Sequence, residues 1–297
     1  MLGFGLGLNK WRRIGGGGFV GLLDLYPNAA AAYSLRKLRA AYSGSAVRVR
    51  KEVSSVSSET DIGFAADGSL DTVSLLAFAS DADSGDVFVV TWYDQSLSND
   101  ATQGTAASQP KIVSGGSLVT ENGKAAIDFD GVDDLLDMGQ TIDLYSLASE
   151  WSVFMDAKII DYSLEAFQRI IINDSSNTSS NIPFGIQLRS NNDVAFFNNG
   201  TVETNLTLSS ATQRTLFSFI KRSGDVLIGI NGSSTTSTKG SVDFTAGLEN
   251  TTIGCSPNGS NRPANMKSAE LIIYPSDQSA NRTGIETNIN TFYSIYP

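Results

Sequence analysis

Short apolar segments rich in β-branched and aromatic residues recur between residues 46 and 274, and Gly, Asn, Asp or Ser separates most of them. This spacing predicts β-strands joined by tight polar turns. Because the segments do not alternate with helices, the pattern favours an all-β, two-sheet antiparallel sandwich over a parallel α/β sheet. The expected strands are 46–50, 87–93, 125–129, 151–160, 170–172, 184–188, 194–197, 216–221, 226–230, 250–254 and 268–274.

Two segments carry helix signals, one near each end of the chain. Residues 29–42 are rich in alanine and follow Asn28, a good N-cap, so they predict an N-terminal helix. Residues 280–293 follow Ser279, which can cap a C-terminal helix. The apolar stripe of this second helix consists of Ile285, Ile289 and Phe292.

The ionisable residues exclude several classes of function. The chain has 31 acidic and 21 basic side chains, a net charge of −10, which argues against a nucleic-acid partner because phosphate recognition needs surplus Lys and Arg. It has no histidine, which excludes Ser-His-Asp triads, histidine general bases and histidine-ligated metals. The single cysteine, Cys255, can form neither an intrachain disulfide nor a cysteine cluster. We expect no cofactor and no metal.

The overall composition predicts a folded protein outside the membrane. With 41% hydrophobic and 18% charged residues, a chain of 297 residues can bury a large core. No apolar run reaches about 18 residues, so we expect no membrane span.

The first 18 residues differ from the rest of the chain. Glycines alternate with large apolar side chains, basic residues follow, and glycines 15–18 provide a hinge. Such a segment cannot bury itself, but it can bind a groove or a sheet edge of a partner; the alternative is a frayed terminus. We therefore expect an anchor segment, 1–18, and a sandwich, 19–297. The expected anchor residues are Phe4, Leu6, Leu8, Lys10, Trp11, Arg12 and Arg13.

Two groups of motifs resemble known families. The first resembles the N-terminal part of the α-L-arabinofuranosidase B catalytic domain and consists of residues 32–44, 47–50, 100–103 and Val90-Thr-Trp-Tyr-Asp-Gln-Ser96. The second is similar to concanavalin A-like, laminin G-like domains and consists of Ile127-Asp-Phe-Asp-Gly-Val-Asp-Asp134, residues 269–277 and the closing helix. The resemblance implies a jelly-roll sandwich with an arabinofuranosidase-like part, 19–110, and a laminin G-like part, 111–297. Domains of this kind also occur in bacteriophage virion proteins.

The arabinofuranosidase resemblance raises the question of catalysis. A retaining glycosidase needs two carboxylates about 5–5.5 Å apart. The resemblance places Arg189 and Ser256 at the two carboxylate positions of the family. Arginine stays protonated, and a serine without a histidine base is not activated, so neither replaces a carboxylate. A shift in register would bring Asp193 or Glu203 into place. We expect no enzyme activity, with an active arabinofuranosidase as the less favoured alternative.

Other residues are weaker candidates for binding. Trp92 and Tyr145 could stack against a sugar ring of a glycan. The alternative for Trp92, Asp94 and Gln95 is a structural turn, because the two polar side chains can bond to turn backbone.

An acidic cluster follows the strand predicted over 125–129. It consists of Asp128, Asp130, Asp133, Asp134 and Asp137. Carboxylates suit Ca²⁺, but the order of an EF-hand loop is missing, and we favour a turn whose acids face water. Calcium binding by Asp130, Asp133 and Asp134 stays open.

Together these features predict a catalytically inactive sandwich that serves as a structural or adhesion protein on the surface of a bacteriophage virion. Its partners would be other virion proteins, bound through residues 1–18, and a homo-oligomer is expected. The alternative function is a lectin-like module that binds a glycan of the host surface.

Overall fold

The structure, a computed structural model, describes residues 18–139, 150–161, 164, 167–173, 184–189, 193–198, 201–207, 213–237, 250–257 and 262–297. Two sets of candidate residues lie outside these ranges. They are the anchor residues Phe4, Leu6, Leu8, Lys10, Trp11, Arg12 and Arg13, and the glycan-stacking candidate Tyr145.

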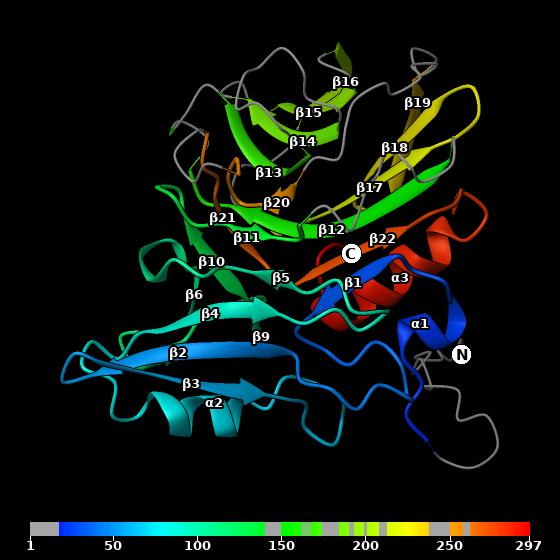
Figure 1. Ribbon diagram of the computed structural model, residues 1–297. Helices are drawn as coiled ribbons and strands as arrows, with labels where there is room; N and C mark the ends of the chain where they lie inside the picture. The colour runs from blue at the N-terminus through cyan, green and yellow to red at the C-terminus, as the bar shows by residue number, and fades with distance from the viewer. Residues whose placement is uncertain are drawn as a thin grey trace, which may run out of the picture.

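The described chain forms antiparallel β-sheets with three α-helices, which confirms the predicted all-β sandwich (Figure 1). One sheet contains, in spatial order, β1 (Ala31–Ser34), β22 (Glu270–Tyr274), β12 (Trp151–Ile159), β17 (Thr215–Lys221), β18 (Val226–Ile230) and β19 (Ser233–Ser237).

The second sheet has two arms. The first arm contains β3 (Val56–Ile62), β2 (Val47–Val53), β4 (Val87–Trp92), β6 (Lys111–Ser114), β10 (Ile127–Asp130) and β21 (Asn265–Ser268), with β7 (Ser117–Leu118) beside β6. The second arm contains β5 (Ala101–Thr102), β11 (Leu136–Asp137), β20 (Thr251–Ile253), β13 (Phe167–Asn173), β14 (Phe184–Arg189), β15 (Asp193–Asn198) and β16 (Thr201–Thr207). The long strand β12 pairs with both sheets. A small hairpin, β8 (Thr120–Glu121) and β9 (Lys124–Ala125), stands apart.

The helix predicted over 29–42 is wrong. Residues Ala31–Ser34 form β1, which pairs with β22 and is fully buried. Asn28 has a φ of 69° instead of the extended backbone of an N-cap, so no helix begins there. Alanine favours a helix by less than about 1 kcal/mol per residue, and the burial of this strand together with its hydrogen bonds to β22 exceeds that preference.

The helices near the N-terminus are α1 (Leu22–Leu25) and α2 (Thr72–Ala79). Asp24 accepts the backbone N–H of Gly21 at 2.8 Å and so caps α1, while Asp71 caps α2 through Ser74. Neither helix was expected, because both are short and the apolar side chains of α2 do not form a clear stripe.

The predicted C-terminal helix is present as α3 (Arg282–Tyr293). Ile285 and Ile289 are fully buried, and the helix packs against β17. Asn281 is its N-cap and makes no side-chain cap bond, so Ser279 does not have the capping role expected of it. Among the described residues no helix is long and apolar enough to cross a lipid bilayer.

Buried ion pairs lie between the first sheet and α3. Arg36 donates from Nε to Glu270 at 2.7 Å, and Arg214 donates from Nε to Asp156 at 2.7 Å; all four side chains are at most 6% exposed. Every carboxylate oxygen of Asp156 and Glu270 accepts at least one hydrogen bond. Buried charges of this kind fold stably only when they are paired and hydrogen-bonded, as these are.

Candidate functional site

The Tyr-Asp-Gln-Ser turn after β4 is structural. Asp94 accepts the backbone N–H of Ala32 at 2.8 Å, and Gln95 Oε1 accepts that of Leu38 at 2.7 Å. The Gln95 amide also donates to the backbone carbonyls of Ser34 and Arg36. The turn therefore holds β1 and the segment after it in place through otherwise unpaired backbone groups.

Trp92 cannot act as a sugar platform in this structure. Its side chain is 0% exposed, and its ring lies 5.8 Å from the ring of Tyr33, centroid to centroid. This corrects the expectation that Trp92 contacts a glycan: the residue continues the apolar face of β4, so the core covers the ring.

A polar cluster lies on the strands β13 and β14, at the opposite end of the molecule from α2 (Figure 1). Arg169 of β13 and Gln187 of β14 are direct cross-strand neighbours, and both are 0% exposed. Side chains of directly paired residues point to the same face of a sheet. A bulge between Arg169 and Ile171 shifts the register, and the three isoleucines that follow Arg169 are all buried.

Ser256 completes this cluster. It follows β20, which pairs with β13, and Arg169 Nη1 donates a hydrogen bond to its Oγ. The turn between β20 and Ser256 needs Gly254, because its φ is 91° and a Cβ there would collide with the ring of Phe129. Ser256 is 0% exposed. We call Arg169, Gln187 and Ser256 the β13–β14 cluster.

Gln187 has an unusual amide for a buried residue. Gln168, which directly precedes Arg169 on β13, is also 0% exposed. Its amide nitrogen donates to the carbonyl of Asp161, and its amide oxygen accepts the N–H of Asn265 at 3.1 Å. Within the described part of the chain, neither Nε2 nor Oε1 of Gln187 has a hydrogen-bond partner. Burying such a group without a partner costs about 1–3 kcal/mol. A ligand that hydrogen-bonds to the amide would explain why the residue is retained.

The residues expected at the carboxylate positions lie in or beside this cluster. Ser256 is a member, whereas Arg189 is half-buried at the end of β14, on the same face as Gln187 by strand alternation. Continuing the register beyond Leu188 and Val194 places Arg189 opposite Asp193, the first residue of β15. Glu203 lies in β16, and its side chain is outside the described residues.

Sequence reasoning missed Arg169. Its signal was present: the polar pair Gln168–Arg169 stands directly before the apolar run Ile170–Ile172, and polar residues inside a buried strand are rarely there for packing alone. The contact with Ser256 joins residues 87 positions apart, and nothing in local sequence indicates such a pairing.

The acidic cluster is only partly assembled as a possible cation site. One oxygen of each of Asp130, Asp133 and Asp134 lies within 4.8 Å of the others. Asp134 is 4% exposed and accepts the N–H of Asp130, while Asp133 accepts the hydroxyl of Ser108. Burial raises the pKa of Asp134 to about 7. The turn expected here is present, with Gly131 at φ 78°, but not all its acids face water.

Comparison with known proteins identifies the fold. No family model and no curated protein matches the chain. A variant of a GH54 α-L-arabinofuranosidase soaked with 4-nitrophenyl α-L-arabinofuranoside matches 90% of this chain and 64% of its own, with a TM-score of 0.65 and 12% identity. An arabinofuranosidase complexed with arabinofuranosyl-α-1,2-xylobiose matches 88% of this chain and 62% of its own, with a TM-score of 0.63 and 14% identity.

A more distant similarity joins the chain to another glycosidase. Trypanosoma rangeli sialidase in complex with a difluorinated nononic acid matches 68% of this chain and 31% of its own, with a TM-score of 0.51 and 10% identity. The chain thus spans less than two thirds of the length of each of these three proteins. At these identities the similarity establishes a glycosidase-like β-sandwich, as the resemblance to arabinofuranosidase B implied.

One expectation is overturned by these structures. The exclusion of enzyme activity is wrong, because the proteins that share this sandwich over most of the chain are glycoside hydrolases. That expectation depended on two single positions, Arg189 and Ser256. They lie in a segment where few motifs fix the alignment with the arabinofuranosidase family. None of the three structures supports a bacteriophage context.

Proposed function

We propose that this chain is a carbohydrate-active protein of the glycoside hydrolase type and that a glycan binds at the half-buried end of the β13–β14 cluster, where Arg189 and Asp193 lie next to Gln187 along the strands. The observation that carries the proposal is the buried amide of Gln187, which has no hydrogen-bond partner among the described residues. Its position in a sandwich of glycosidase-like fold supports the proposal.

The chemistry of the cluster suits a sugar. Each sugar hydroxyl both donates and accepts hydrogen bonds, and the Gln187 amide offers two donors and one acceptor in return. Arg189, on the same strand and the same face, adds charge-assisted donors at the half-exposed end of the cluster.

A hydrolytic step would need a carboxylate beside the glycan. Asp193 begins the strand next to Gln187 and is half-buried, so it is the described carboxylate best placed for this role. Retaining hydrolysis needs a second carboxylate about 5–5.5 Å away. Glu203 does not lie opposite Asp193: Asp193 pairs with Thr207, four residues further along β16, so we assign a role to Asp193 alone.

The proposal is tested by measuring binding and bond cleavage separately. Binding of arabinofuranose-substituted xylo-oligosaccharides is measured by calorimetry, and release of 4-nitrophenol from its α-L-arabinofuranoside by absorbance. We expect Gln187→Leu to weaken binding by about tenfold or more, and Asp193→Asn to abolish release while binding persists. The matched control is Gln213→Leu, at an exposed glutamine before β17. A wild-type chain that neither binds nor cleaves these sugars would contradict the proposal.

We further propose that residues 1–18 attach the sandwich to another protein of a virion, at whose surface it binds a host glycan as a homo-oligomer. The alternation of glycine with Phe4, Leu6 and Leu8, followed by Trp11, supports this role, because it presents large apolar groups that the segment cannot bury alone. Light scattering of the full chain and of a variant lacking residues 1–18, with and without virion proteins, tests it. Attachment by the full chain alone is expected; equal behaviour of both would refute the anchor.

A further inference from the structure

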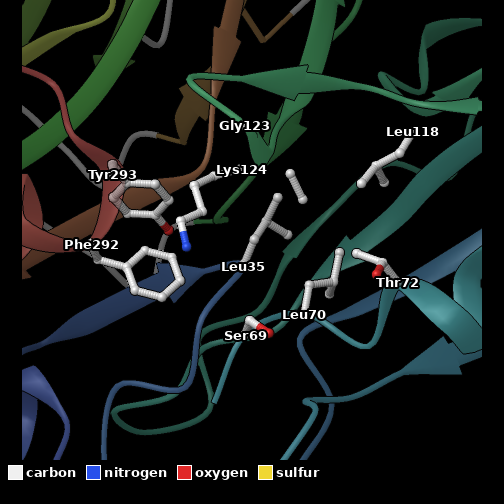
Figure 2. A pocket seen from close by; sticks show the side chains of 10 residues that line it. Leu35, Ser69, Leu70, Thr72, Leu118, Gly123, Lys124, Phe292 and Tyr293 are labelled. Atoms are coloured by element: carbon white, nitrogen blue, oxygen red, sulfur yellow. The ribbon is translucent and has the colours of Figure 1, made fainter. Parts of the chain in front are cut away.

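A pocket lies away from the β13–β14 cluster, between the β8–β9 hairpin, the start of α2 and the end of α3. It has a volume of about 230 Å³. Figure 2 shows the side chain of Lys124 in this pocket, with the rings of Phe292 and Tyr293 on one side and Leu70, Thr72 and Leu118 on the other. Its wall combines apolar and polar surface in similar amounts, and among the described residues that line it Lys124 is the one cation.

The hairpin turn places Lys124 at this pocket. Asn122 and Gly123 have φ values of 51° and 72°, the left-handed pair that a two-residue type I′ turn requires. Lys124 follows directly and pairs with Glu121 across the hairpin. Its Nζ lies 4.3 Å from the centroid of the Phe292 ring, which holds the ammonium group at the pocket wall.

Lys124 differs from the ion-paired lysines of this protein. Lys51, Lys111 and Lys158 each lie within 4 Å of a carboxylate oxygen. Within the described ranges, no carboxylate lies within that distance of Lys124. Asp67, whose pKa is lowered by its hydrogen bonds with Ser69 and also by the charge of Lys124, is exposed and lies beyond ion-pair distance. A charged amine in a partly apolar pocket with no carboxylate within 4 Å is a ready partner for an anionic ligand.

The other polar groups around the pocket leave this role to Lys124. Arg36 also lies over the Phe292 ring, at 5.0 Å, but its charge is neutralised by Glu270. The Ser69 hydroxyl donates to Asp67, an exposed carboxylate, at 2.6 Å. Thr72 also carries a hydroxyl, but it lies beside the leucines, across the pocket from Lys124.

We propose that this pocket binds a small organic monocarboxylate with an apolar body. The carboxylate binds the ammonium of Lys124, and the body packs against Leu35, Leu70 and Leu118. The volume admits one ring or a short chain, and a doubly charged or fully polar ligand would leave apolar wall unsatisfied. This site is separate from the proposed glycan site and does not depend on it.

The test measures binding of benzoate and of the neutral isostere benzamide by ligand-observed NMR and calorimetry. We expect benzoate to bind in the millimolar range or better and benzamide about tenfold more weakly. Lys124→Met should weaken benzoate about tenfold, and Lys124→Arg should retain it, because only the first removes the charge.

The matched control is Lys37→Met, at a lysine that also lies over an aromatic ring, that of Phe19 at 5.8 Å, but outside this pocket. It should bind benzoate as the wild type does. A second variant, Ala125→Leu, fills the pocket without touching charge and should also abolish binding. Thermal unfolding checks that each variant is folded. Equal binding of benzoate and benzamide, wild-type affinity in folded Lys124→Met, or no binding by the wild type would overturn the proposal.

Discussion

The Asp94–Gln95 turn and the β13–β14 cluster both bury a glutamine completely, yet the two regions treat it differently. Gln95 has a partner for its acceptor and two for its donors, all of them backbone groups of residues 34–38. Gln187 has none within the described residues. The first arrangement contributes to stability, whereas the second carries a cost of about 1–3 kcal/mol that folding does not recover. Buried polar residues of the same type can therefore be assigned to structure or to function by their hydrogen bonds.

The largest effect on stability is expected when the buried ion pair of Arg36 and Glu270 is broken. Arg36→Met leaves Glu270 buried without its partner, and we expect a loss of about 3–5 kcal/mol in the free energy of unfolding. Urea unfolding measures it. The control is Arg48→Met, which removes an ion pair whose side chains are 43% and 40% exposed and should cost far less than Arg36→Met. Similar losses in both variants would show that burial does not distinguish these pairs.

Removing the amide of the paired glutamine should have the next largest effect. Gln95→Leu leaves three buried backbone groups without partners, and we expect a loss of about 3 kcal/mol. The same urea experiment measures it. A loss below about 1 kcal/mol would mean that the turn does not hold β1 as its hydrogen bonds indicate.

Asp134 is intermediate between the fully hydrogen-bonded Gln95 and the unpaired Gln187. It accepts one backbone N–H and has two acidic neighbours. Because burial raises its folded-state pKa to about 7 from a usual 3.8, the folded chain holds this proton more tightly than the unfolded chain. Its contribution to stability is full below pH 3.8 and is lost as the pH rises through about 7. Asp134→Asn should remove this slope and raise stability at pH 8 by roughly 1–3 kcal/mol. Urea unfolding at pH 5 and pH 8 measures it; an unchanged slope would contradict it.

The smallest effect on stability is expected at the unpaired glutamine. Gln187→Leu should change the free energy of unfolding by less than about 0.5 kcal/mol, or increase it, because no hydrogen bond to a described residue is lost. Gln168→Leu is the matched comparison on the adjacent strand and should cost about 1–3 kcal/mol, since it leaves the N–H of Asn265 unpaired. If Gln187→Leu proves the more damaging of the two, the distinction between the regions is lost.

Much of the fold could be predicted from the hydrophobic pattern of the sequence. Residues 151–160 and 216–221 read as strands and form β12 and β17, which pair over seven positions. The stripe of Ile285 and Ile289 located α3 correctly. These elements are long enough for their periodicity to outweigh local propensity.

Only part of the candidate site could be predicted from the sequence. The segments containing Gln187 and Ser256 were singled out by resemblance, but the residue that joins them, Arg169, was not. Their proximity depends on the pairing of β13 with both β14 and β20, which crosses large separations along the chain. Pattern indicates which face of a strand is buried, but it does not say which strand lies beside it.

Composition and periodicity alone established an all-β chain without histidine chemistry, because these properties are local or additive along the sequence. They did not decide the state of residues 31–34, where alanine favours a helix and the pairing with β22 imposes a strand. Nor did they decide which buried amides are paired, since a glutamine reads identically in every strand. Both outcomes depend on which distant backbone groups lie within hydrogen-bond reach, and only the folded chain brings those groups together.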